Sequence, residues 1–148
     1  MENLVIREVY DSDLEEMVGL CGQLGYPTTL EAFKSHLGLV KKDKHLVLVA
    51  ELLETGVVGW IHVMPRRLLV AGFYCEVGGI IVDEKHRRKG IGKALLETAE
   101  HWVLDSGCQG MIIRSNQERQ ASHSFYTKTG YQAMKKQEVY IKTFTSPA

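Results

Sequence analysis

The fold of this chain is decided by one stretch, Gly78-Gly79-Ile80-Ile81-Val82, which continues through Asp83-Glu84-Lys85-His86 into Arg87-Arg88-Lys89-Gly90-Ile91-Gly92-Lys93. Its apolar, β-branched start predicts a buried strand, and the residues after it predict a helix. The loop between them lies where a helix presents unpaired N–H groups and the positive end of its dipole. Its cations and small residues let a phosphate approach the backbone, so the stretch predicts a site for a polyanionic cofactor.

The composition excludes several classes of protein. With 148 residues and 45% hydrophobic content, the chain is long enough for one domain, residues 1–148, around a single core. Lys plus Arg and Asp plus Glu both number 18, so no chain-wide charge favours nucleic acid or an anionic membrane. An anion site must therefore be local. The basic residues of the loop, between Lys85 and Lys93, are candidates for this site; the alternative is that they only form a solvated helix start.

The cysteines Cys21, Cys75 and Cys108 are widely spaced and form no Cys-x-x-Cys pair. This pattern fits a reducing compartment rather than a disulfide framework, and it predicts a cytoplasmic protein. Neither these cysteines nor the histidines have the spacing of metal ligands, so we expect no metal site. The chain does not open with a basic and then an apolar segment, and no apolar run approaches the roughly 20 residues that span a bilayer.

Hydrophobic periodicity predicts a mixed order of strands and helices. Strands are expected over residues 4–9, 46–53, 57–64, 73–82, 111–114 and 137–144. The first two helices should open at the capping boxes Ser12-x-x-Glu15 and Thr28-x-x-Glu31, and two more are expected over residues 90–106 and 118–128. The second helix should fade near Gly38, and Pro65 should break a strand. Residues 76–114 should form a parallel crossover, so the fold class is α/β or mixed α+β.

The glycine loop fits neither of two well-known phosphate motifs. A Walker loop needs glycine where Arg87 stands and Ser or Thr where Ala94 stands, and a dinucleotide fingerprint needs a small residue in place of Leu95. What fits is Arg87-x-x-Gly90-x-Gly92 after a strand, which resembles the acetyl-CoA loop of the GNAT superfamily of N-acetyltransferases. That superfamily commonly ends in a helix with Asn, then Phe-Tyr, then Gly and an aromatic residue. The same order stands here as Asn116, Phe125-Tyr126 and Gly130-Tyr131.

The resemblance implies a central twisted mixed sheet of about six to seven strands, with about four helices packed on both faces. It also implies that the strand holds the pantetheine arm through its backbone and that the loop wraps the pyrophosphate. The paired glycines Gly78-Gly79 independently predict a bulge or a close ligand approach. The residues expected to contact the cofactor are Ile80, Ile81, Val82, Arg87, Arg88, Lys89, Gly90, Ile91, Gly92, Lys93, Asn116 and Tyr126. Many family members have glycine where Arg88 stands. This departure bears on the conformation of the loop, because a side chain disfavours positive φ. Asn116 either contacts the cofactor or only caps the helix that follows it.

An alkyl amine with a pKa of about 10.4 is protonated at pH 7, and keeping it neutral for attack on a thioester costs roughly 4–5 kcal/mol. A base, or a binding site that lowers the pKa of the amine, is therefore useful. Glu76 is the first candidate base, acting directly or through water. A carboxylate is costly to place on an otherwise apolar strand, so its presence there calls for an explanation. The alternative explanation is an ion pair with an arginine on a neighbouring strand. His62 is the second candidate, with strand packing as its alternative. By resemblance, Tyr126 is the acid that protonates the leaving sulfur, with a structural tyrosine as the alternative.

We therefore expect an enzyme that moves acetyl from acetyl-CoA to a primary amine by direct attack, without an acyl-enzyme. Its acceptor is an aminoglycoside, a polyamine, an amino acid or a protein amine, and the sequence is compatible with a homodimer. The first alternative is a catalytically inactive acyl-CoA sensor or interaction module. The second is a nucleic-acid binder that uses the basic loop, against which the neutral total charge argues.

Overall fold

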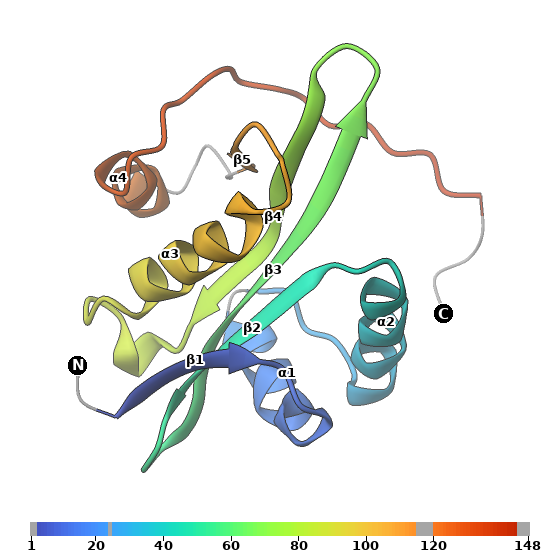
Figure 1. Ribbon diagram of the computed structural model, residues 1–148. Helices are drawn as coiled ribbons and strands as arrows, with labels where there is room; N and C mark the ends of the chain where they lie inside the picture. Colours follow the sequence, from blue (N-terminus) through green and yellow to red (C-terminus); the bar gives the residue numbers. More distant parts are fainter. Residues whose placement is uncertain (1–2, 24, 115–119, 145–148) are drawn as a thin grey trace. The chain divides into compact units, whose positions relative to one another are not determined.

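The computed structural model describes residues 3–23, 25–114 and 120–144, and the chain divides into two compact units, residues 1–114 and residues 115–148 (Figure 1). The strands of the first unit are β1 (Leu4–Glu8), β2 (Leu46–Leu52), β3 (Gly56–Leu68), β4 (Gly72–Val82) and β5 (Met111–Ile113). Its helices are α1 (Leu14–Gln23), α2 (Leu30–Lys42) and α3 (Ile91–Leu104), with short 3-10 turns over Asp11–Asp13 and Glu84–His86. In the second unit, α4 spans Gln120–Lys128.

The first unit is built on one sheet with the strand order β1-β2-β3-β4-β5. Hairpin turns join β2 to β3 and β3 to β4, and all pairs from β1 to β4 are antiparallel. β4 and β5 pair in parallel with α3 between them in the chain, which confirms the predicted crossover over residues 76–114. The mixed α/β fold class is confirmed. Among the described residues the sheet has five strands, fewer than the six to seven expected.

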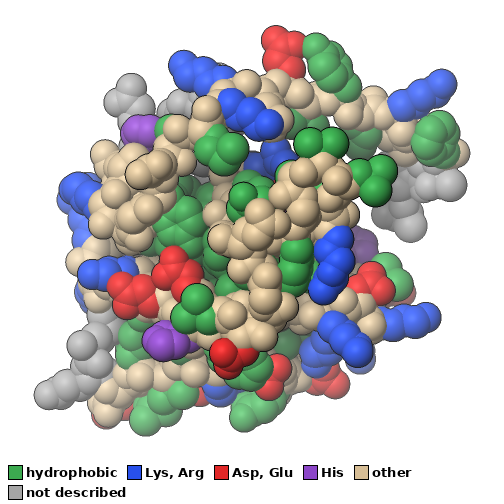
Figure 2. All heavy atoms as spheres, turned by 45° about the horizontal axis from the view of Figure 1, so that its top comes forward, with side chains coloured by type: hydrophobic (Ala, Val, Ile, Leu, Met, Phe, Trp, Pro, Cys, Tyr) green, Lys and Arg blue, Asp and Glu red, His purple; other side chains and the backbone are tan. Residues whose placement is uncertain are grey.

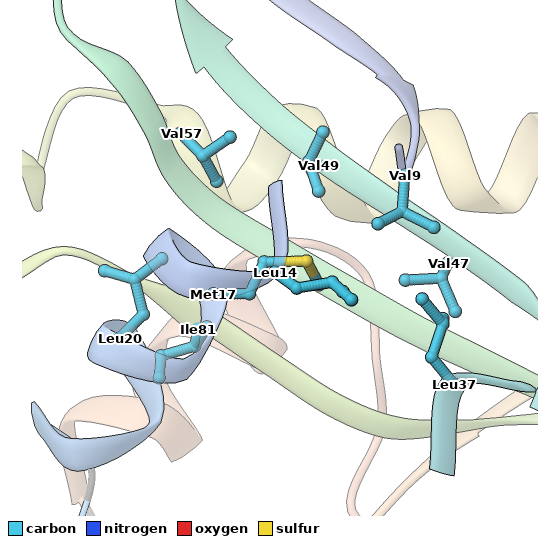
Figure 3. Close-up of a cluster of buried hydrophobic side chains, with 9 residues drawn as sticks. All are labelled: Val9, Leu14, Met17, Leu20, Leu37, Val47, Val49, Val57 and Ile81. Carbon is cyan, nitrogen blue, oxygen red and sulfur yellow. The ribbon is translucent and has the colours of Figure 1, made fainter. Parts of the chain in front are cut away.

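Helices cover the sheet on both faces. On one face α3 packs so closely that a Cβ at Gly59 would lie 3.3 Å from Cδ1 of Leu95. On the other face Phe33 of α2 meets Trp60 edge-to-face, with ring centroids 6.1 Å apart. These two faces differ because successive strand residues point to opposite sides. Figure 3 shows the apolar cluster that α1 and α2 help to enclose: Val9, Leu14, Met17, Leu20, Leu37, Val47, Val49, Val57 and Ile81.

The predicted helix starts are displaced by about one residue. Thr29, rather than Thr28, caps α2, and its Oγ1 accepts the N–H of Ala32 at 3.0 Å. Before α1, the carboxylate of Asp13 accepts the N–H of Tyr10 at 2.6 Å and holds a 3-10 turn.

α2 also runs past Gly38 to Lys42, so the expected end near Gly38 was wrong. Gly38 is exposed and keeps a right-handed backbone conformation, so it costs the helix only part of its stability. Two lysines in the last turn, Lys41 and Lys42, complement the negative end of the helix dipole.

Pro65 does not break its strand, because β3 continues to Leu68 and pairs with β4 throughout. β2 stops pairing with β3 at Val63, so the following residues of β3 have a strand neighbour on one side only. Proline lacks an N–H group and is tolerated on such an edge. The hairpin of β3 and β4 therefore projects beyond the rest of the sheet (Figure 1).

The strand expected over residues 137–144 is absent, since no regular structure follows α4 up to residue 144. Val139, Tyr140 and Ile141 are 84–89% exposed. α4 itself ends at Lys128, and the φ of +98° at Gly130 lets the N–H of Tyr131 reach the carbonyl of Tyr126 at 3.0 Å. None of the helices within the described ranges combines the length and apolar character needed to cross a membrane.

Candidate active site

A β-bulge interrupts the pairing of β3 with β4 at the paired glycines, as predicted. His62 pairs with Gly79 and Val63 pairs with Val77, so Gly78 is an extra residue in β4. Gly78 is exposed, and a Cβ there would lie 2.5 Å from Nδ1 of His62. A larger residue does not fit without moving this ring. Gly78 has no paired position in β3 or β5, so the backbone N–H groups at the bulge are the candidates to donate to a developing oxyanion.

β4 parts from β5 at the same point. The paired positions are Cys75, Glu76 and Val77 in β4 with Met111, Ile112 and Ile113 in β5. From Gly78 onward, β4 pairs only with β3 in the part of the chain that the structure describes. The other backbone edge over Ile80, Ile81 and Val82 can therefore bind an extended ligand as a neighbouring strand would. The side chain of Ile81 is 3% exposed and packs in the core, so this residue offers a ligand its backbone alone.

The loop after β4 holds two residues in the left-handed region. Gly90 caps α3 with a φ of +81°, and Arg88 has a φ of +63°. Arg88 therefore adopts the conformation for which many family members use glycine. Nε of Arg87 donates to the carbonyl of Val82 at 3.1 Å and ties the loop back to the strand. This geometry leaves the first N–H groups of α3 directed out of its end.

The charge of this loop suits an anion. Within the described residues, no carboxylate forms an ion pair with Lys85, Arg87, Arg88 or Lys89, and all four side chains are exposed; Lys93 lies 3.8 Å from Glu97. The first turn of α3 carries no acid. Ile91 is 1% exposed, so it too offers only its backbone. Elsewhere, basic and acidic side chains are interspersed on the face in Figure 2.

Substitutions at Arg88 and Gly90 should change stability in opposite directions. A side chain in the left-handed region costs roughly 1–2 kcal/mol. Arg88→Gly should therefore raise the free energy of unfolding, by less than about 1 kcal/mol because glycine also gains freedom in the unfolded chain. Gly90→Ala should lower it by about 1 kcal/mol. Denaturant unfolding measures both variants, and equal losses in the two would contradict this account of the loop.

Glu76 has the arginine partner that was the alternative to its role as a base. Its Oε1 lies 2.5 Å from Nη1 of Arg66 on β3 and 3.0 Å from Nε of Arg114, just after β5. The side chain of Glu76 is 11% exposed. The charges of the two arginines therefore compensate the negative charge of this nearly buried carboxylate. Both arginines donate to Oε1, and Oε2 accepts no hydrogen bond from the described residues, so this oxygen is open to a water or an amine.

His62, the second candidate base, lies beside the bulge and pairs with a second histidine. Its Nε2 is 2.9 Å from Nδ1 of His45, and the two rings stack with centroids 5.1 Å apart. Burial, followed by the charge of His45, lowers the pKa of His62 from its usual value. His62 is therefore neutral at pH 7 and has a free ring nitrogen for a proton.

In the second unit, Tyr126 lies on α4 among aromatic rings. Its ring centroid is 5.2 Å from that of Phe125 and 6.4 Å from that of Tyr131, both in edge-to-face contact. This packing fixes the direction of the phenol. Asn116, the remaining predicted contact, lies outside the described residues.

The first unit thus brings together the strand edge, the loop and both candidate bases. The sequence did not identify three residues of this region: His45, Arg66 and Arg114. Each of them contacts a site residue on another strand, so its role depends on the register of the sheet. The register pairs Val47 with His62, which brings His45, two residues earlier on the same face, next to the His62 ring.

Comparison with known proteins agrees with this geometry. A family model described as the acetyltransferase (GNAT) family matches residues 6–131. The chain belongs to this family. It is therefore an enzyme of the acetyltransferase class, as the resemblance of the glycine loop predicted.

Two relatives and one solved structure illustrate the family. A Bacillus subtilis protein named as an uncharacterized N-acetyltransferase, YhdJ, is 26% identical over 132 residues, which cover 88% of this chain and 90% of the relative. Glucosamine 6-phosphate N-acetyltransferase 1 of Oryza sativa subsp. japonica is 30% identical over 135 residues, which cover 85% of this chain and 79% of the relative. The aminoglycoside N-acetyltransferase AAC(6')-Iy in complex with CoA has a TM-score of 0.83, with 22% identity and 94% of each chain covered, so the two folds agree.

Proposed function

We propose that this acetyltransferase moves the acetyl group of acetyl-CoA to a primary amine, by direct attack and without an acyl-enzyme. One observation carries the proposal. β4 leaves β5 at the Gly78 bulge and runs from there into the start of a helix that has no acid in its first turn. A ligand lying along this edge would meet the backbone amides of the bulge at one end and an anion-binding loop at the other.

The binding roles follow from these groups. The backbone of Ile80, Ile81 and Val82 would hold the pantetheine arm, because amide groups of an extended ligand can pair with an open strand edge. The amides and cations of residues 87–93 would hold the pyrophosphate. The proposed contacts in this loop are Arg87, Arg88, Lys89, Gly90, Ile91, Gly92 and Lys93. Asn116 and Tyr126 are added from the resemblance alone.

The reaction forms an N–C bond to the acetyl carbon and breaks the C–S bond. The amide of Gly78 would stabilise the oxyanion, and Tyr126 would give its proton to the departing sulfur. Two groups are proposed to take the proton of the amine: His62 directly, and Glu76 through water. Oε1 of Glu76 already accepts from two arginines, whereas Nδ1 of His62 faces the bulge. These contacts favour His62 for direct transfer.

For the acceptor we put amines on sugar rings first. The rice relative is named for glucosamine 6-phosphate, and the CoA-bound neighbour is named for aminoglycosides. Polyamines, amino acids and protein amines form the second group. A cytoplasmic location, in line with the unpaired cysteines, and a homodimer remain parts of the proposal.

The decisive experiment is an acceptor screen with purified protein and acetyl-CoA. CoA release is expected with at least one amino sugar, and mass spectrometry should find the product heavier by one acetyl group. Tight binding of CoA without turnover on any amine would instead identify a sensor. Binding of DNA with a steep dependence on salt would identify a nucleic-acid site.

A further inference from the structure

We propose that His62 and His45 form a proton relay that carries the proton of the acceptor amine from the Gly78 bulge to solvent. The inference rests on the proposed acetyl transfer to an amine. It adds a second histidine to that reaction, one that need not touch the substrate.

The two rings are placed for transfer in one direction. Nδ1 of His62 faces the bulge, since it would be 2.5 Å from a Cβ on Gly78. Nε2 of the same ring is 2.9 Å from Nδ1 of His45. Each imidazole is thus able to accept a proton at one nitrogen and release a proton from the other.

The backbone fixes His45 while its ring keeps access to water. The N–H of His45 donates to the carbonyl of Val40 at the end of α2, at 2.9 Å, and this contact anchors the turn into β2. Both residues are partly exposed, and burial is the larger cause of the lowered pKa of His62. Because Nδ1 of His45 faces His62, Nε2 is the ring nitrogen of His45 from which a proton reaches solvent.

The protons balance along this path. An acceptor ammonium gives one proton to Nδ1 of His62, and the proton on Nε2 of His62 passes to Nδ1 of His45. The proton on Nε2 of His45 then passes to water. The resulting amine forms the N–C bond and loses its second proton as the amide is made, while the sulfur of CoA gains one proton. The net reaction releases one proton, which the relay delivers to solvent.

Other charges near the pair do not replace this route. On β4, Glu76 pairs in register with Met64, two residues after His62 in β3, and its carboxylate is held by Arg66 and Arg114. Around the end of α2 the charged groups are Lys41, Lys42, Asp43 and Lys44, all exposed. Of these groups, none contributes to the pKa of His62, whose only charged influence is His45.

The first test uses three variants in weakly buffered solution with an amine identified by the acceptor screen. His45→Ala should lower kcat by about tenfold or more, because general acid–base steps are worth about 10²–10⁴ and His62 itself remains. Added imidazole should restore the rate in proportion to its concentration, since it accepts the proton from His62. His45→Asn keeps a hydrogen-bonding group near the former Nδ1 but cannot pass a proton, so it should stay slow. His36→Ala, which removes an exposed histidine of α2, is the control and should keep the normal rate.

Two outcomes would overturn the relay. Normal rates in His45→Ala and His45→Asn would leave His62 as a lone base. A slow His45→Ala with a normal His45→Asn, and no response to imidazole, would reduce His45 to a structural contact. Absence of turnover in the unaltered protein would instead refute the proposed function.

A second measurement needs no substrate. Nitrogen-15 NMR of the histidine rings measures the titration of His62. His45→Asn should raise the pKa of His62, because the charge that lowers it is removed. An unchanged titration of His62 in this variant would show that the two rings do not exchange charge, and the relay would be excluded.

Discussion

Gly92→Glu is expected to weaken the binding of CoA by about 100-fold or more, a loss of about 2.7 kcal/mol. The substitution places an anion in the first turn of α3, where the proposed site binds a diphosphate. Juxtaposed like charges cost several kcal/mol when they are poorly solvated. Gly92 is the better position than Gly90, whose positive φ would add backbone strain to the effect on the ligand.

The same change should leave the fold intact or make it more stable. Gly92 is the second residue of α3 and has no positive φ. Replacing a helical glycine removes a cost of about 0.5–1 kcal/mol, and an acid near a helix start adds roughly 0.3–1 kcal/mol. Tm should therefore rise while affinity falls. This opposition separates a binding defect from unfolding.

Isothermal titration with CoA measures the expected loss, and Gly92→Gln is its matched control. Glutamine has the size of glutamate without its charge, so it should cost less affinity. Equal losses in both variants would assign the effect to bulk. Unchanged affinity in Gly92→Glu would remove the diphosphate from the start of α3.

Much of the first unit could be predicted because its signals are local. The hairpin turn before Gly56 and the glycine pair Gly78-Gly79 are read from a few neighbouring residues. The effect of Pro65 could not be read in this way. Its cost depends on whether β2 extends alongside it, and that is set by register rather than by local sequence.

The strand expected over residues 137–144 failed for a related reason. Alternating apolar residues predict which face a strand would bury, yet a strand also requires a partner for its backbone. No strand of the described chain pairs with residues 137–144. The pattern therefore identifies exposed apolar side chains without supplying the sheet edge that would pair with them.

In the site, too, the features that depend on local sequence could be predicted and those that depend on register could not. The loop of Gly90 and the bulge of Gly78 were predicted, because glycine is needed where a backbone bends or is approached closely. The conformation of Arg88 was not expected of an arginine, and the structure alone reveals it. The ion pairs of Glu76 and the contact of His62 with His45 join residues far apart in sequence, so they needed the register of the sheet.

Tyr126→Phe is expected to lower kcat by roughly 10²-fold or more, with little change in the KM for acetyl-CoA, since proton transfer by a positioned acid is worth about 10²–10⁴. Phenylalanine keeps the edge-to-face contacts with Phe125 and Tyr131 and removes only the hydroxyl. Tm, measured on the same variant, separates a loss of catalysis from a loss of folding. Steady-state kinetics with an amine from the acceptor screen measure the effect.

Tyr131→Phe provides the matched control for this prediction. It makes the same chemical change on the neighbouring ring, 6.4 Å from Tyr126 between centroids, and should keep a normal rate. A slow Tyr126→Phe beside a normal Tyr131→Phe would assign the loss to one hydroxyl rather than to aromatic packing. A slow Tyr126→Phe should also recover with thioesters whose thiol is a better leaving group, because such a sulfur needs no acid. Near-normal turnover in Tyr126→Phe would limit this tyrosine to its contacts with Phe125 and Tyr131, and the departing thiolate would then take its proton from solvent.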